Sequence, residues 1–165
     1  MMKKLNKSGL TLMETLVALL ILVMLVLAMD YCTNSAMGVF KEATFTADSA
    51  TLSGILNTSL ADVLRYSEEV EATEDRVTFT NYDYGVRGVY LNISGDVIRM
   101  TSPEDDLSRF LVNTGAYPNL KVLDFSVNYN ADKDFYKIGY TIQNSEDANL
   151  SRHVDYVVRR IETGY

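Results

Sequence analysis

Cysteine, histidine and proline are scarce in this chain of 165 residues. Cys32 is the single cysteine, so an intrachain disulfide is excluded and packing must stabilise the fold. His153 is the single histidine, so a zinc site would need carboxylates for its remaining ligands, and we expect neither a metal nor a cofactor. No serine or cysteine nucleophile motif surrounds His153, and we therefore predict no catalytic residues and no enzyme activity.

The absence of proline before Pro103 removes the strongest helix breaker from the first part of the chain. Residues 10–29 form an apolar run with one charged residue, Glu14. A helix of that length spans about 30 Å, the thickness of the hydrocarbon core of a bilayer. We therefore predict a transmembrane helix over residues 10–29.

The charges around this run predict how the chain is oriented. Lys3, Lys4 and Lys7 precede it in a leader, residues 1–9, that carries no acid. Basic residues favour the cytoplasmic side, so we expect a single-pass protein with a cytoplasmic amino terminus and an extracytoplasmic head. Removal of the leader would change the formal net charge from -7 to -10. An acidic head repels polyanions, which makes nucleic acid an unlikely direct ligand.

A secretory signal would be cut after the apolar run, at small residues, whereas this run ends in Leu27-Ala28-Met29-Asp30. Here a small residue, Gly9, instead precedes the apolar run. The segment Lys3-Lys4-Leu5-Asn6-Lys7-Ser8-Gly9, followed by Leu10-Thr11-Leu12-Met13-Glu14, closely resembles the type III signal sequence of type IV prepilins and pseudopilins.

This resemblance implies that a prepilin peptidase cuts between Gly9 and Leu10 and methylates the new amine of Leu10. Phenylalanine or methionine is usual there in the family, so Leu10 is a departure. Further implied partners are other pilin or pseudopilin subunits, an inner-membrane assembly platform with its ATPase, and membrane lipid before assembly. Many pilins close a carboxy-terminal loop with two cysteines, and this chain cannot.

Glu14 needs a physical reason, because a charged side chain in the bilayer centre costs about 2.5–3.5 kcal/mol. Cleavage would place a positive amine on Leu10, one helical turn away. In the family, the counterpart of Glu14 is thought to meet the amine of a neighbouring subunit, which gives Glu14 a role in subunit assembly. The alternative is that Glu14 reaches the lipid headgroups or pairs with the amine of its own chain.

The rest of the chain predicts an α+β fold in which the long amino-terminal helix packs on an antiparallel β-sheet head, as in pilins. Residues 30–66 continue the helix with an apolar face that includes Val39, Phe40, Leu52, Ile55, Leu56, Leu60, Val63 and Leu64. Residues 67–165 form the head, in which alternating apolar residues predict strands. The predicted strand segments are 77–79, 89–93, 97–100, 120–129, 136–142 and 154–158.

Two segments of the head lack this alternation. The acidic stretch 68–75 is predicted to be a connector. Residues 102–119 are predicted to leave the sheet, either as a functional loop or as a short helix that closes one edge.

We therefore expect a structural subunit of a type IV pilus or a type II secretion-like pseudopilus. One alternative is a tip subunit for adhesion or for DNA uptake in competence. The other is a membrane-anchored extracellular binding domain that never polymerises.

Overall fold

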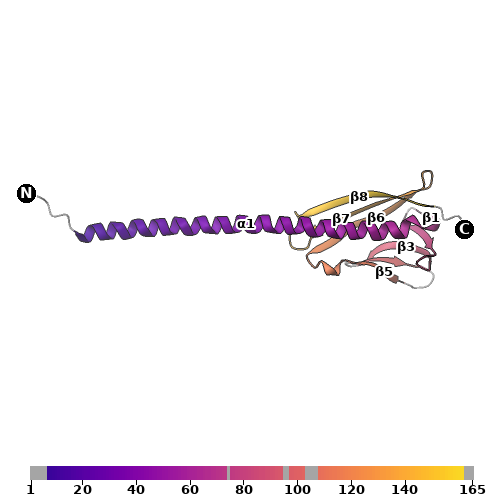
Figure 1. Cartoon of the computed structure of the whole chain (residues 1–165), viewed down its shortest axis with the longest axis horizontal. Helices are drawn as coiled ribbons and strands as arrows, with labels where there is room; N and C mark the ends of the chain where they lie inside the picture. The colour runs from indigo at the N-terminus through magenta and orange to yellow at the C-terminus, as the bar shows by residue number, and fades with distance from the viewer. Residues whose placement is uncertain (1–6, 74, 95–96, 103–107, 162–165) are drawn as a thin grey trace, which may run out of the picture. The chain divides into compact units, whose positions relative to one another are not determined.

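The computed structural model describes residues 7–73, 75–94, 97–102 and 108–161, with side chains from residue 12 onward except that of Thr114. The chain divides into two compact units, Met1–Thr44 and Phe45–Tyr165. A single helix, α1 (Lys7–Arg65), contributes to both units, and the strands lie in the second (Figure 1).

α1 is 59 residues long and contains no proline. Four of its threonines, a residue type that disfavours helix interiors, donate their hydroxyl groups to carbonyls of the preceding turn. Thr33 Oγ1 donates to Met29 O at 2.8 Å, and Thr58 Oγ1 donates to Gly54 O at 2.9 Å. These local bonds satisfy the hydroxyls without competing for a helical N–H.

Five strands form the first antiparallel sheet, in which each strand pairs with its neighbour in sequence. The strands are β1 (Glu68–Ala72), β2 (Val77–Asn81), β3 (Val86–Ser94), β4 (Val97–Thr101) and β5 (Ser108–Asn113). Ser94 pairs with Val97, which confirms the hairpin predicted between 89–93 and 97–100. Its two turn residues, 95 and 96, lie outside the described residues.

The remaining strands form a second antiparallel sheet in the order β6-β7-β8. They are β6 (Leu120–Asn130), β7 (Phe135–Asn144) and β8 (Ser151–Arg159), and the short 3-10 helix η1 (Thr114–Ala116) precedes them. The sequence predicts one sheet, whereas the chain forms two. The division falls between β5 and β6, where Gly115 and Pro118 interrupt the apolar pattern.

The acidic stretch predicted to be a connector contains strand β1, so that prediction is wrong. Glu68 pairs with Thr80 and Ala72 with Val77. β1 is an edge strand, and its acidic side chains lie at the surface, so it needs no apolar alternation to pair. Sequence periodicity alone does not reveal such a strand.

The excursion predicted over residues 102–119 contains strand β5, which the sequence did not predict, followed by the short 3-10 helix η1. Val112 is buried and pairs with Ile98 of β4, while Phe110 pairs with Arg99. A β-branched and an aromatic residue favour a strand here, and pairing with β4 extends the sheet by one edge strand. Residues 103–107 of this segment lie outside the described residues.

β6 carries a bulge that explains an irregularity in its apolar pattern. Before the bulge, the buried residues Leu120 and Val122 have even residue numbers. After it, the half-buried residues Phe125, Val127 and Tyr129 have odd residue numbers. The register shifts between Leu123 and Ser126, and Asp124 there has a φ of 53°. One extra residue reverses the faces of the strand, so both halves direct apolar side chains inward.

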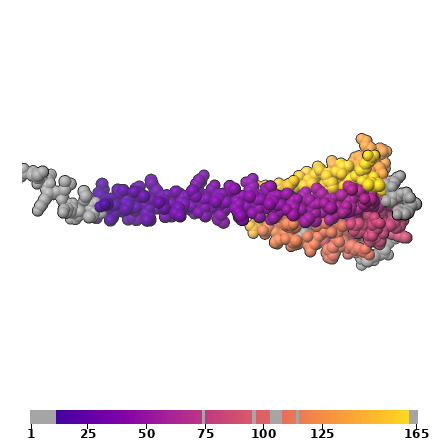
Figure 2. All heavy atoms as spheres, in the orientation of Figure 1, coloured from indigo at the N-terminus to yellow at the C-terminus, as the bar shows by residue number. Residues whose placement is uncertain are grey.

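The core of the second unit lies between α1 and both sheets. The helix contributes one stripe at helical spacing, which consists of Phe45, Ser49, Leu52, Ser53, Leu56, Leu60, Val63 and Leu64. The sheets contribute Phe79, Val89, Ile98, Met100, Tyr136, Ile138, Tyr140 and Ile142, among others. Figure 2 shows this part of α1 at the surface of the unit, with β8 along one side. The predicted α+β class is confirmed, and the arrangement is consistent with a pilin-like architecture.

Candidate assembly surface

The first described part of α1 is apolar around its whole circumference. The large apolar side chains from Leu12 to Met29 are each between 52% and 68% exposed. Consecutive residues point in all directions around a helix, so this segment has no polar face to turn toward water. It is the one candidate membrane-spanning helix among the described residues, which is consistent with a single-pass membrane protein.

Glu14 is the only charged residue within this apolar segment, and it is exposed. Among the side chains that the structure describes, Glu14 forms no ion pair with a basic residue. In lipid or against apolar helices, an unpaired carboxylate in this position is costly.

The residues predicted for processing lie at the start of the chain. Lys3 and Lys4 fall outside the described residues. Lys7, Gly9 and Leu10 lie within α1, which places Leu10 and Glu14 one helical turn apart along the same backbone. The predictions of cleavage and methylation therefore stay predictions.

The apolar surface of α1 continues past the predicted span. Val39 and Phe40 are 66% and 71% exposed, so the prediction that they belong to the buried face is wrong. The buried stripe begins at Phe45, where the second unit begins. Ile55 was predicted to face the core and is also exposed, because the stripe follows Leu52 and Leu56 instead.

Buried polar groups fix α1 in the second unit. Tyr140 of β7 donates its hydroxyl to Asn57 Oδ1 at 2.7 Å, and Tyr140 Oη lies 3.2 Å from Ser53 Oγ. Tyr136 Oη and Ser67 Oγ are 2.6 Å apart. Burial raises the pKa of Tyr136 to about 12, although the hydrogen bond with Ser67 works in the opposite direction. Both tyrosines therefore stay neutral near pH 7 and tie one strand to the helix.

The last carbonyls of α1 are satisfied by residues that follow the helix. Asn81 Nδ2 donates to Val63 O at 2.8 Å, Ser67 Oγ donates to Leu64 O at 2.7 Å, and the Ile161 N–H donates to Arg65 O at 2.8 Å. A helix end leaves such carbonyls without intrahelical partners, and burying them unpaired is costly. Residues of the head therefore supply the hydrogen bonds that cap the carboxy-terminal end of α1.

A polar cluster holds the segment after β8. Asp134 Oδ1 accepts hydrogen bonds from Arg160 Nε at 2.7 Å and from Tyr129 Oη at 2.5 Å. Burial acts to raise the pKa of Asp134, but the bonds from Arg160 and Tyr129 and the charge of Arg160 outweigh it and lower the pKa. This cluster lies next to Ile161, so it supports the bond that caps α1.

The sequence did not reveal these polar anchors. Asn57, Ser67 and Asn81 are residue types that usually face water, and nothing in their spacing separates them from surface residues. A partial signal existed for Ser49 and Ser53, because both fall on the same helical stripe as the buried leucines.

The described residues contain no cluster of three or more His, Cys, Asp or Glu side chains positioned to hold a metal ion. Comparisons of the chain with family models, curated protein sequences and solved structures give no match. The class that can be stated is therefore an α+β protein with one candidate membrane-spanning helix.

Proposed function

We propose that the chain is the precursor of a structural subunit of a type IV pilus or a type II secretion-like pseudopilus. One observation carries this proposal: α1 exposes apolar side chains on all sides from Leu12 to Met29, and a single carboxylate, Glu14, interrupts them. A simple membrane anchor needs the apolar segment but has no use for a charge within it.

Processing is the first step of the proposed function. A prepilin peptidase cuts between Gly9 and Leu10 and removes the three lysines of the leader. The apolar helix is retained, in contrast to a secretory signal, and the amine of Leu10 becomes a cation that the peptidase methylates. This step creates the charge that Glu14 lacks within the described chain.

Assembly is the second step. Before assembly, lipid surrounds residues 10–29. In the filament, the same surface packs against the helices of other pilin or pseudopilin subunits, and Glu14 meets the amine of a neighbouring Leu10. Removing one member of a buried charge pair typically costs about 3–5 kcal/mol, so a subunit in the wrong register is strongly disfavoured. Insertion is driven by the ATPase of an inner-membrane assembly platform, and the product is an extracellular or periplasmic filament.

Mass spectrometry of the amino terminus tests this proposal most directly. The protein is isolated from the membranes and the sheared filaments of its own host. We expect a chain that begins at a methylated Leu10. A matched Gly9→Val variant should keep its leader, because a branched side chain at the cleavage site blocks the peptidase. A wild-type chain that retains Lys3 and Lys4 would instead support a membrane-anchored binding domain that never polymerises.

A further inference from the structure

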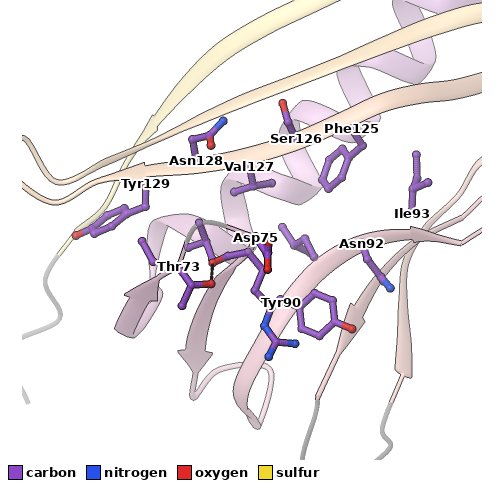
Figure 3. A pocket seen from close by; sticks show the side chains of 14 residues that line it. Thr73, Asp75, Tyr90, Asn92, Ile93, Phe125, Ser126, Val127, Asn128 and Tyr129 are labelled. Atoms are coloured by element: carbon purple, nitrogen blue, oxygen red, sulfur yellow. Dashed lines mark hydrogen bonds between the residues drawn. The ribbon is translucent and has the colours of Figure 1, made fainter.

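A hollow of about 580 Å³ in the second unit is bordered by both sheets (Figure 3). The turn between β1 and β2, residues 90–93 of β3 and residues 125–129 of β6 line it. Figure 3 shows Phe125 and Val127 on the side of β6 that faces the hollow. Its volume lies within the range of about 300–1,000 Å³ that is typical of small-molecule sites.

Two opposite charges are adjacent in the turn that borders this hollow. Asp75 and Arg76 both line it, and both side chains are exposed. Thr73 holds the turn, because its N–H and its hydroxyl each donate to Arg76 O at 2.9 Å. The guanidinium carbon of Arg76 lies 5.3 Å from the ring centroid of Tyr90 in β3. This cation–π contact orients the guanidinium without using its N–H donors.

Neither charge is neutralised within the part of the chain that the structure describes. Asp75 and Arg76 form no ion pair with each other, and neither side chain makes an ion pair or a hydrogen bond with another described residue. Arg160 differs, because its guanidinium binds Asp134 at 2.7 Å. The edge of the hollow therefore offers one carboxylate acceptor and one oriented guanidinium donor.

β3 and β6 add apolar side chains to the lining. Leu91 and Ile93 of β3 are half-buried, as are Phe125 and Val127 of β6. These side chains pack against the core on one side and keep part of their surface exposed on the other. An apolar group placed in the hollow would remove this remaining surface from water, which is favourable.

The lining defines the chemical class of the ligand. Asp75 repels an anion, and Arg76 repels a cation. A wholly apolar molecule would desolvate both charges without pairing them, which is costly. A small molecule that carries one ammonium, one carboxylate and one apolar group matches all three parts of the lining.

We propose that the hollow binds a free α-amino acid with an apolar side chain. The ammonium of the ligand pairs with Asp75, its carboxylate pairs with Arg76, and its side chain lies against Val127 and Ile93. Both polar contacts are charge-assisted hydrogen bonds, and the planar guanidinium suits a carboxylate. The proposal concerns the head alone, so it does not depend on whether the chain enters a filament.

Titration with L-leucine tests the proposal. The full chain in detergent micelles is isotope-labelled at its backbone nitrogens, and the amide resonances of Arg76, Tyr90 and Val127 report binding. We expect saturable shifts with L-leucine. Leucinamide lacks the carboxylate, N-acetyl-leucine lacks the ammonium, and glycine lacks the apolar side chain, so each should bind at least about tenfold more weakly.

Two protein variants assign the polar contacts. Arg76→Gln should weaken the binding of L-leucine at least about tenfold without weakening that of leucinamide, which has no carboxylate to lose. Asp75→Asn should likewise weaken the binding of L-leucine without weakening that of N-acetyl-leucine. Both positions are exposed, so neither substitution removes a core contact. Arg87→Gln is the matched control, because Arg87 stacks on Tyr82 outside the hollow, and it should bind L-leucine normally.

Three results would overturn the proposal. The first is the absence of a saturable shift with L-leucine. The second is equal binding of L-leucine, leucinamide and N-acetyl-leucine, or an equal loss of binding in Arg87→Gln and Arg76→Gln. The third is saturable binding of glucose, used as an uncharged polar probe, where L-leucine does not bind, which would assign the hollow to a neutral sugar instead.

Discussion

Asn81 shows how a single buried side chain can determine where a long helix ends. Its amide is fully buried, donates to Val63 O and accepts from the Tyr84 N–H at 3.2 Å. The side chain therefore satisfies a helix carbonyl and also orders the turn after β2. At the residue scale, the stability of the head depends on such pairings because α1 has no capping sequence of its own at Arg65.

We predict that Asn81→Ala lowers the free energy of unfolding of the head by about 1–3 kcal/mol, because Val63 O is left buried without a donor. Guanidinium unfolding of the full chain in micelles, followed by the near-UV signal of the tyrosines, measures the change. Asn149→Ala is the matched control, since Asn149 is exposed and bonds locally with Asp147, and it should change stability by less than about 0.5 kcal/mol. Equal effects of the two variants would contradict the capping role of Asn81.

Glu14 supports a second prediction at this scale, which rests on the proposed function. Glu14→Gln keeps the size of the side chain but removes its charge. We expect normal cleavage and at least about a tenfold loss of the chain from sheared filaments, because the amine of a neighbouring Leu10 is left unpaired. Immunoblots of filament and membrane fractions measure the ratio. Thr15→Val, which removes a local bond to Leu12 O, should assemble normally. Normal incorporation of Glu14→Gln would rule out the register role.

At the scale of elements, the segment after β8 is held by Asp134, which has a φ of 51° in the turn between β6 and β7. Its folded-state pKa lies below the value of about 3.9 expected for an unfolded chain. A lowered carboxyl pKa contributes stability above the unfolded pKa, and this contribution is lost as the pH falls through the folded value.

We therefore predict that Asp134→Asn destabilises the head at neutral pH, and that the difference from wild type shrinks below a pH of about 4. Asparagine tolerates the left-handed backbone of this turn, so the variant mainly removes the charge. Unfolding midpoints at several pH values measure the effect. A difference between the two proteins that stays constant as the pH falls would show that the pairing with Arg160 contributes nothing.

The elements that the sequence predicts correctly are those that bury an apolar face. α1 and the six strands with alternating residues follow directly from periodicity, and even the bulge in β6 is visible as a change from even to odd apolar positions. β1 and β5 are edge strands that depend on pairing with β2 and β4, so their local sequence carries little signal. The candidate site divides in the same way. Glu14 stands out in an apolar run, whereas Asn81 and Ser67 acquire their roles only from the tertiary structure.

At the scale of the whole molecule, the exposed apolar segment of α1 determines where the chain can reside. Replacing both Leu19 and Val23 by arginine places two charges on one face of the predicted span, at about 2.5–3.5 kcal/mol each. We predict that this variant is released from membranes by alkaline carbonate, whereas wild type is retained. The control replaces Ser35 and Val39 by arginine. These two residues have the same spacing but lie beyond the predicted span, so the control should be retained. Retention of the Leu19/Val23 variant would argue against a membrane-spanning role.

The bond from Ile161 to Arg65 also constrains the order in which the chain can mature. Local contacts let α1 form early, but its end is closed by a residue synthesised long afterwards, and such distant closures are slow. Until β7 and β8 have paired, only the first sheet is available to cover the stripe from Leu52 to Leu64. A newly made chain therefore passes through a stage in which α1 has formed but the apolar core of the head is still partly exposed. Quality control of newly made chains should act on that stage.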